Sequence, residues 1–141
     1  MLLLLAALAA QPPVLPAGPG KETVQKLCSN CHGVVILLAP RRTKPAWQKS
    51  VEQMAALGVE GSDEEFETVV EYLTRHFGKI NVNRASEAEL RQVLDIGAKE
   101  AEAIVRHRQR NGDFKDMESV RKAAGLDAGK MIELRDRILF R

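Results

Sequence analysis

The sequence predicts an all-α protein made of two small helical domains. Apolar residues recur at helical spacing in several segments, for example at Val69, Leu73 and Phe77. Two Ser-x-x-Glu capping boxes, Ser62–Glu65 and Ser86–Glu89, mark the starts of helices. Aromatic residues make up only 4% of the 141 residues, so neither domain has many large side chains for its core. A bound cofactor would help to stabilise a domain of this size.

The chain divides into three parts where its composition and pattern change. Residues 1–20 hold an apolar run and a Pro- and Gly-rich linker, residues 21–78 form a first helical domain, and residues 79–141 form a second. The first domain carries seven Lys and Arg against eight Asp and Glu, and the second carries fourteen against eleven. The second domain is therefore mildly basic, without the strong excess of positive charge that by itself indicates nucleic-acid binding.

The N-terminal segment has the pattern of an export signal. Residues 1–10 are an unbroken apolar run that is too short to span a bilayer as a mature helix. The triplet Ala7-Leu8-Ala9 fits a small-x-small cleavage site, although a positively charged start is missing. We expect either a cleaved signal peptide or an uncut N-terminal membrane tether. Both place the rest of the protein in the periplasm or another extracytoplasmic compartment.

The two cysteines of the chain form a haem-attachment motif. Cys28 and Cys31 lie three residues apart, and His32 follows directly. A structural zinc site needs four ligands and a thioredoxin-like pair needs a preceding strand, and the sequence offers neither. Two thioethers at this spacing attach the two vinyl groups of a haem, and the adjacent histidine binds the iron from the proximal side. We therefore expect one covalently bound haem c, with His32 as an iron ligand.

The second axial ligand of the iron is predicted to be Met54. Its thioether lies on the apolar face of a predicted helix, where the alternative role is core filling. His76 is the rival ligand. A Met/His pair leaves no free coordination site, which favours electron transfer over catalysis on small molecules. Arg42 and Trp47 are either hydrogen-bond donors to the haem propionates or, equally well, a solvated charge and a packing residue.

Further residues of the first domain agree with a haem fold. The matching set is Cys28–His32, Arg42, Trp47, Val51, Met54, Gly58 and residues 69–73. With these residues the segment 21–78 resembles a family of compact bacterial class I cytochromes c. The resemblance implies three short helices around the haem, and electron transfer with a redox partner protein.

The second domain repeats a helix, a glycine turn and another helix twice. Its turns are Asp95–Ala98 and Ala124–Asp127. The wider pattern consists of Ile80–Asn83, Ala85, Ser86, Glu89, Leu90, Ala101, Ile104, Arg108, Asn111, Gly112, Phe114, Val120 and Leu134. With these residues the segment 79–141 resembles the tandem helix-hairpin-helix domain of ComEA-type competence DNA receptors.

The resemblance implies one DNA phosphate site in each hairpin. In such domains, backbone N–H groups at the start of the second helix face a phosphate, and glycines allow the close approach. The implied residues are Ile96, Gly97, Ala98 and Lys99 in the first hairpin, and Gly125, Leu126 and Lys130 in the second. Asp95 and Asp127 stand where glycine is usual. A carboxylate there repels phosphate, although Asp127 could instead cap the last helix.

Basic side chains surround both hairpins. They are Lys99, Arg106, Arg108, Arg110, Lys122 and Lys130. These cations either offset the two aspartates or form a solvated face together with nearby glutamates. Sequence-independent binding to the backbone of duplex DNA and a plain packing or docking role therefore both fit the second domain.

Taken together, the motifs predict an exported electron carrier with one haem, rather than an enzyme. The second domain then serves for docking or for non-specific DNA binding. The alternative is a periplasmic, competence-like DNA-binding protein in which the haem domain senses redox state or adds stability. An enzyme with an open sixth iron site is a third hypothesis, which Met54 as a ligand argues against.

Overall fold

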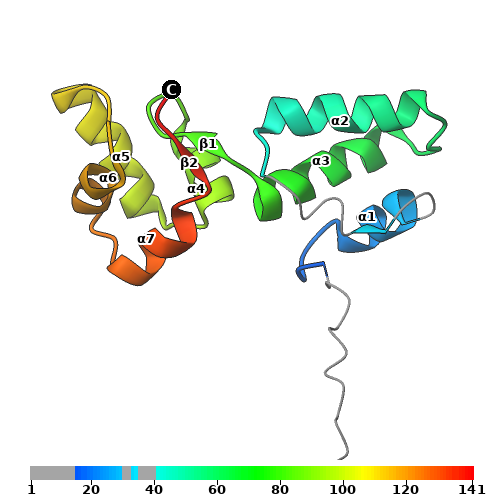
Figure 1. Cartoon of the computed structure of the whole chain (residues 1–141), viewed down its shortest axis with the longest axis horizontal. Helices are drawn as coiled ribbons and strands as arrows, with labels where there is room; N and C mark the ends of the chain where they lie inside the picture. The colour runs from blue at the N-terminus through cyan, green and yellow to red at the C-terminus, as the bar shows by residue number, and fades with distance from the viewer. Residues whose placement is uncertain (1–14, 30–32, 35–40) are drawn as a thin grey trace, which may run out of the picture.

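The computed structural model describes residues 15–29, 33–34 and 41–141, and shows two groups of helices joined end to end (Figure 1). The first group contains α1 (Lys21–Cys28), α2 (Lys44–Ala56) and α3 (Asp63–Phe77). The second contains β1 (Ile80–Asn81), α4 (Glu87–Leu94), α5 (Ala98–Asn111), α6 (Met117–Ala124), α7 (Ala128–Leu134) and β2 (Ile138–Leu139). The prediction of an all-α fold is confirmed, because the two strands hold only two residues each.

The first domain is built on the antiparallel pair α2 and α3, with α1 packed against α3. Pro45 lies in the first turn of α2, where its missing N–H costs no helical hydrogen bond. The capping box of α3 forms as predicted, since Ser62 Oγ accepts from the Glu65 N–H at 3.1 Å and Glu65 accepts from the Ser62 N–H at 3.0 Å. The core of the domain consists of Leu15, Val24, Leu27, Cys28, Trp47, Val51, Val69, Val70, Tyr72, Leu73 and Phe77.

The folded part of the first domain includes residues 15–20, which the sequence assigned to a linker. Leu15 is only 3% exposed and belongs to the core. The Tyr72 hydroxyl donates a hydrogen bond to the Pro16 carbonyl at 2.6 Å. Gly20 has a φ of +91° and lies so close to α3 that a Cβ would come within 3.1 Å of Tyr72. This segment therefore packs as a strap across α3.

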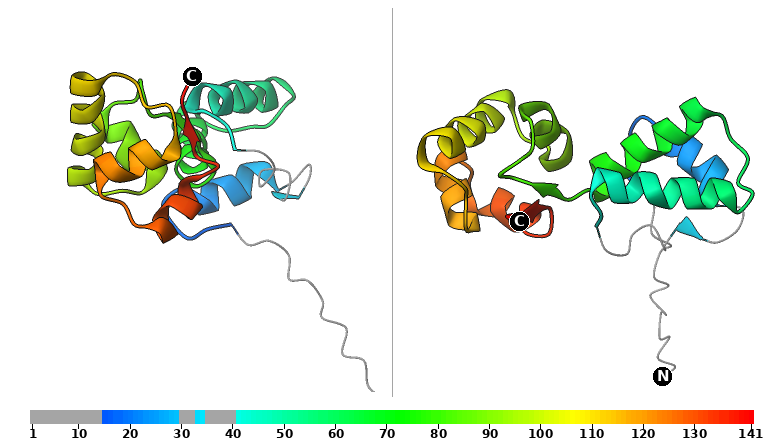
Figure 2. Two further views of the ribbon diagram at one scale, coloured as in Figure 1. Left: turned by 60° about the vertical axis from the view of Figure 1, so that its left-hand side comes forward. Right: turned by 90° about the horizontal axis from the view of Figure 1, so that it is seen from above.

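The second domain closes by joining its first and last segments. Strands β1 and β2 pair in parallel, with Ile80 opposite Ile138, and both views in Figure 2 show them side by side. Asn83 strengthens this closure, because its amide donates to the carbonyls of Phe114 at 2.9 Å and Phe140 at 3.0 Å. Its side-chain oxygen also accepts from the Phe114 N–H at 2.8 Å. The β1 turn, the α5–α6 loop and the C-terminal segment thus meet at one amide.

The core of the second domain lies among α4, α5 and α6, closed by α7 and β2. It consists of Ile80, Val82, Ala85, Leu90, Val93, Leu94, Ile96, Ala101, Ile104, Phe114, Val120, Ala124, Met131, Leu134 and Ile138. These residues follow the helical spacing read from the sequence. Within the part of the chain that the structure describes, no helix is both long and apolar enough to cross a bilayer.

The two domains meet at the C-terminal end of α3 without an extended linker. The Arg42 N–H donates to the Phe77 carbonyl at 3.1 Å, and the Lys79 N–H donates to the Arg42 carbonyl at 2.9 Å. Gly78 lies between these bonds, and a Cβ there would lie 2.0 Å from the Thr74 carbonyl oxygen. A side chain at position 78 would therefore force α3 and the following strand apart.

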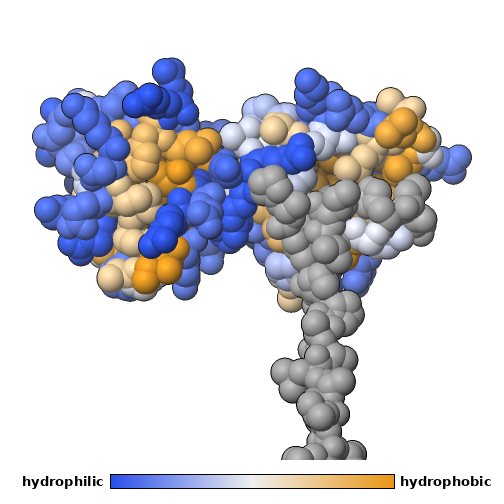
Figure 3. Space-filling view, in the orientation of Figure 1, coloured by the Kyte–Doolittle hydropathy of each residue, from blue (hydrophilic) through white to orange (hydrophobic). Residues whose placement is uncertain are grey.

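Polar side chains add to this contact between α3 and α4. The Glu71 carboxylate on α3 accepts hydrogen bonds from Lys44 of α2 and from Gln92 of α4. Arg41 donates to the His76 carbonyl at 2.8 Å. Figure 3 shows hydrophilic residues gathered where the two domains meet on this face.

We predict that Asn83→Ala destabilises the protein by about 2 to 4 kcal/mol, because it leaves two carbonyls and one N–H of the closure without partners. Urea unfolding followed by far-UV circular dichroism measures the change. Asn111→Ala is the matched control, because the Asn111 amide contacts only His107 on the same helix. Equal effects of the two substitutions would show that Asn83 does not hold the domain closed.

Candidate functional site

The haem-attachment motif begins where α1 ends. Cys28 is the last residue of that helix and is 8% exposed, and burial raises the pKa of its thiol. Cys31 and His32, the other two residues predicted to hold the haem, lie outside the described residues. The attachment motif therefore stays a prediction, with the structure placing its first thiol in the core of the first domain.

Met54 lies at the same end of the domain as Cys28. Leu27, next to Cys28, and Phe66, near the start of α3, both lie against Gly61. A Cβ added to Gly61 would be 3.2 Å from each of these side chains. Met54 is in the last turn of α2, which runs antiparallel to α3, and it packs half-buried against the same core. The thiol predicted to attach a vinyl group and the thioether predicted to bind iron thus lie at one end of the apolar core, and haem binding there stays a prediction.

The rival ligand His76 lies toward the opposite end of α3. Its ring packs against Tyr72 with 4.5 Å between centroids, and its Nε2 is 3.3 Å from the position of a Cβ on Gly18. Nε2 is buried and has no hydrogen-bond partner in the described part of the protein. Ten residues of helix separate Phe66 from His76, which is about 15 Å along the axis. This separation supports Met54 over His76 as the predicted ligand.

Arg42 and Trp47, the predicted propionate donors, have partners within the protein. The Trp47 indole N–H donates to the Phe77 carbonyl at 3.3 Å. The Arg42 guanidinium lies 5.5 Å above the centre of the Trp47 ring and donates to Ser50 Oγ at 3.2 Å. These contacts favour the packing interpretation of Trp47 and place Arg42 against it rather than as a purely solvated charge, and the contact of either residue with a haem stays a prediction.

The first hairpin connects α4 to α5 through Asp95, Ile96 and Gly97. Asp95 adopts the left-handed conformation, with φ 52° and ψ 51°, and its N–H donates to the Arg91 carbonyl at 3.1 Å. Among the described residues it is the only non-glycine with a positive φ. Ile96 is buried in the core and fixes the hairpin. Asp95, which stands where glycine is usual in the motif, therefore takes the conformation that glycine adopts most easily.

The first turn of α5 has no capping hydrogen bond from a side chain among the described residues, although the Glu100 carboxylate lies over it. Gly97 is the N-cap of this helix. The first amides of α5 therefore lack helical partners and carry the positive end of the helix dipole. Glu100 lies close by, with Oε2 at 2.3 Å from the position of a Cβ on Gly97. A side chain at position 97 would displace this carboxylate, which shares the site predicted for phosphate.

The second hairpin has a similar backbone, but the side chain of its own Asp127 caps the N-terminus of its second helix, α7. Gly125 is left-handed, with φ 68°, at the position that corresponds to Asp95. Asp127 caps α7, and its Oδ1 accepts from the Lys130 N–H at 2.8 Å. An amide that was predicted to face a phosphate is thus already bonded to a carboxylate. The two hairpins are alike in fold and differ in the access they give to an anion.

Comparison with known proteins supports this description of the second half. Residues 75–139 match the helix-hairpin-helix motif family. An uncharacterized protein of Haemophilus influenzae is 40% identical over 63 residues, which cover 44% of this chain and 56% of that protein. ComE operon protein 1 of Bacillus subtilis is 36% identical over 47 residues, which cover 33% of this chain and 23% of that protein. The second half of the chain, residues 75–139, is thus similar to the helix-hairpin-helix motif family.

The chain covers less than two thirds of the length of either curated relative. No solved structure matches it. The family match begins within α3, so the helix-hairpin-helix domain includes the junction with the first domain. The first domain up to residue 74 lies outside that match.

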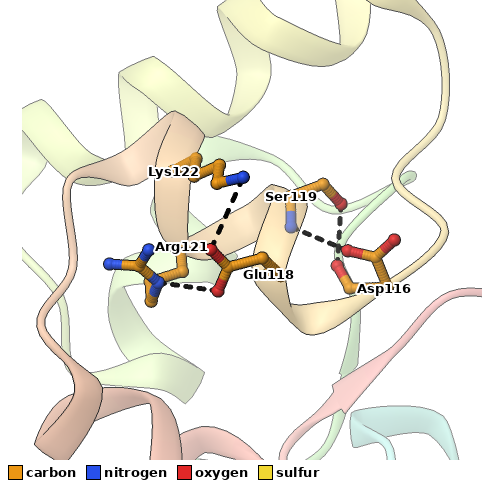
Figure 4. Close-up of polar contacts among 5 residues, drawn as sticks. All are labelled: Asp116, Glu118, Ser119, Arg121 and Lys122. Atoms are coloured by element: carbon orange, nitrogen blue, oxygen red, sulfur yellow. Dashed lines mark hydrogen bonds and ion pairs between the residues drawn. The ribbon is translucent and has the colours of Figure 1, made fainter.

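Most of the basic side chains around the hairpins already form ion pairs or hydrogen bonds with other groups of the protein. Figure 4 shows Glu118 between Arg121 and Lys122, and the hydrogen bonds from Arg121 hold the pKa of Glu118 at about 2. Of the six predicted cations, four are engaged: Arg106 with Glu102, Arg108 with the Val82 carbonyl, Lys122 with Glu118, and Lys130 with Glu133. Lys99 and Arg110 have no ion pair in the described part of the chain. Lys99, in the first turn of α5, is therefore the cation best placed for the open hairpin.

One acidic residue of the site differs from an alternative drawn from the sequence. Glu100 belongs to the glutamates of the solvated-face alternative, whereas its carboxylate covers the N-terminus of α5. Its position three residues after the N-cap is the signal that would have indicated this, because that is the position of Glu in a capping box. Asp116, whose role the sequence did not indicate, caps α6 by accepting from the Ser119 N–H at 2.7 Å.

We predict that the stability of the protein falls as the pH drops below 6.5, the ordinary pKa of histidine, partly because of His76. Burial, and to a smaller degree repulsion by Arg75 and Arg137, lowers the pKa of His76 in the folded protein. The unfolded chain therefore binds this proton at a higher pH than the folded one, so acid favours unfolding.

Urea unfolding of the wild type and of His76→Phe across this pH range tests the prediction. The phenyl ring keeps the contact with Tyr72, so the variant should lose part of the pH dependence without losing the fold. His107→Asn serves as the control and should leave the pH dependence in place. If the free energy of unfolding changes equally with pH in the wild type and in His76→Phe, His76 does not contribute to the loss of stability in acid.

Proposed function

We propose that the protein binds the backbone of duplex DNA, independently of sequence, through the first hairpin of its helix-hairpin-helix domain. The observation that carries the proposal is the uncapped N-terminus of α5 at Gly97, next to the unpaired Lys99. A phosphate there would accept hydrogen bonds from free amides and interact with the positive end of the helix dipole. The resemblance to ComEA-type competence receptors and the match to ComE operon protein 1 support this function.

The second hairpin contributes less to this binding. Its amide at Lys130 is already bonded to Asp127, and α7 has only seven residues. Asp95 and Glu100 place two carboxylates near the open hairpin and lower its affinity for phosphate. One or two phosphate contacts give weak binding that salt reduces with a shallow slope, about −0.9 for each phosphate.

We also propose that the first domain carries one haem c, attached through Cys28 and Cys31, with His32 and Met54 as iron ligands. The buried Cys28 thiol and the half-buried Met54 thioether at one end of the core support this. Bound haem would supply a one-electron redox centre that exchanges electrons with a partner protein. The apolar core of α1, α2 and α3 would keep water from one side of that centre.

These proposals describe an exported DNA-binding protein with a haem domain, and not an enzyme. The helix-hairpin-helix match favours DNA binding as the leading role, with the haem as a redox sensor or a stabilising group. In the other proposed assignment, electron transfer by the haem domain is the main role, and the second domain serves to dock the protein onto a partner. An export signal or membrane tether in residues 1–20 would place either form in the periplasm.

We predict that Asp95→Asn tightens DNA binding by about two- to fivefold at low salt, because it removes one negative charge beside the helix N-terminus. Asparagine also tolerates the left-handed conformation, so the fold should not change. Lys99→Gln should weaken binding and make the salt slope shallower by about one. Fluorescence anisotropy with a labelled duplex across a salt series measures both.

Asp113→Asn is the matched control, since it removes an equal charge from the loop at the far end of α5. It should change the affinity for DNA much less than Asp95→Asn. If the two variants bind alike, or if Lys99→Gln keeps the wild-type slope, DNA does not contact the first hairpin.

We predict that protein matured in a haem-loading periplasm gains the mass of one haem, and that Cys28→Ala and Cys31→Ala lose the two-thioether attachment. Met54→Ala should open the iron to carbon monoxide in the reduced protein, because its predicted ligand is gone. Mass spectrometry and absorption spectra measure these changes. Colourless wild-type protein would disprove the haem proposal and leave the DNA proposal untouched.

A further inference from the structure

A cavity of about 340 Å³ lies at the junction of the two domains. Its walls come from the start of α2, the end of α3, the turn after β1, and α4. This volume is within the range of small-molecule sites, which often lie between domains. The cavity is separate from both hairpins and from the Cys28 end of the first domain.

Positive charge dominates the rim of this cavity. Lys44, Lys79 and Arg84 line it, against one carboxylate, that of Glu89. The Glu89 carboxylate is already held by the N–H and hydroxyl of Ser86, each at 2.8 Å. Lys44 is paired with a glutamate of α3, whereas Lys79 and Arg84 have no ion pair within the described residues. The rim therefore offers two cations to an anionic ligand.

The N-terminus of α2 opens into the same cavity. Thr43 is its N-cap and lines the cavity with Lys44 and Pro45, and no side chain accepts a hydrogen bond from the first turn. This helix has thirteen residues, so its dipole adds positive potential at the opening. Pro45 removes one N–H from this first turn, so the N–H groups of Lys44 and Ala46 remain, and together with the two cations they favour an oxyanion such as phosphate.

Thr74 provides a separate indication of a ligand. It lines the cavity and is only 1% exposed, and its hydroxyl has no partner within the described residues. A threonine within a helix can bond the carbonyl four residues earlier, as Thr68 does with Glu64 at 2.8 Å. A buried hydroxyl without a partner is costly. Its oxygen has almost no accessible surface, so rotation of the side chain toward a polar group of a ligand in the cavity would be needed to remove that cost.

The remaining wall of the cavity is apolar. Pro45, Ile80, Ala85 and Val93 contribute to it. Such a wall adds little for inorganic phosphate but fits the organic part of a phosphate ester. The site thus combines an oxyanion-binding rim with an apolar wall.

We propose that the junction cavity binds a small phosphorylated organic molecule about the size of a mononucleotide. Its phosphate lies between Lys79, Arg84 and the N-terminus of α2, and its organic part lies on the apolar wall beside Thr74. The ligand is either a free nucleotide or the phosphorylated terminal nucleotide of a DNA strand. Because the site joins both domains, its occupation stabilises their relative arrangement. The proposal does not rest on DNA binding at the hairpin.

The full chain is titrated with a nucleoside 5′-monophosphate, with the same nucleoside lacking phosphate, and with inorganic phosphate. Trp47, the only tryptophan of the sequence, lies one turn from Lys44 and reports binding by its fluorescence. Thermal unfolding provides a second measurement. The monophosphate should raise the melting temperature, and the other two compounds should have much weaker effects.

Thr74→Val separates the proposal from a simple packing defect. It removes the unpartnered hydroxyl, so it should raise the melting temperature of the free protein and weaken monophosphate binding about tenfold. Lys79→Gln should weaken binding too, whereas Lys49→Gln, on the same α2 helix outside the cavity wall, should not.

Two duplexes, with and without 5′-phosphates, distinguish the sources of the ligand. Tighter binding of the phosphorylated duplex, lost in Thr74→Val, assigns the cavity to a DNA end. Equal binding of the two duplexes, with the monophosphate still bound, assigns it to a free nucleotide. No response to the monophosphate, or unchanged affinity in Thr74→Val, would overturn the proposal.

Discussion

The close contact between the end of α3 and the helix-hairpin-helix domain is the constraint on which the rest of the structure depends. Each domain has a small core, and the C-terminal end of α3, whose side chains belong to the first core, contacts α4 of the second domain. Gly78 allows this contact because a Cβ there would collide with the Thr74 carbonyl. Backbone bonds from Arg42 and Lys79 then fix the direction in which the chain enters the second domain. The junction cavity and the pairing of Glu71 with Lys44 and Gln92 follow from this contact.

The two hairpins show how one side chain changes the use of a shared backbone. Gly97 offers no capping side chain to α5, where Glu100 lies over the first turn, whereas Asp127 accepts a hydrogen bond from an amide of α7. In the proposed DNA-binding role, the second hairpin would contribute less, and most of the contact with phosphate would fall to the first. A single phosphate contact of this kind would exchange rapidly.

The sequence predicted the features that depend on local pattern. The capping boxes at Ser62 and Ser86 and the all-α fold follow from spacing and backbone preference. The left-handed conformation of Asp95 was not predicted, although its place at a usual glycine position was a signal for it. The Leu15–Gly20 strap, the β1–β2 pair and the unpartnered Thr74 hydroxyl depend on contacts between distant residues, which no local window contains. The placement of Glu100 over the N-terminus of α5 could be predicted only in part. Its position in the sequence is a local signal, but the orientation of its side chain depends on the absence of a capping side chain at Gly97.

The closure at Asn83 has a consequence for biosynthesis. The amide joins a residue at the start of the second domain to the Phe140 carbonyl, so the domain cannot close until that last segment has left the ribosome or an export channel. Until then its hairpins are not held in place. In the proposed DNA-binding role, nascent chains still in transit would therefore not bind nucleic acid until the whole domain has emerged.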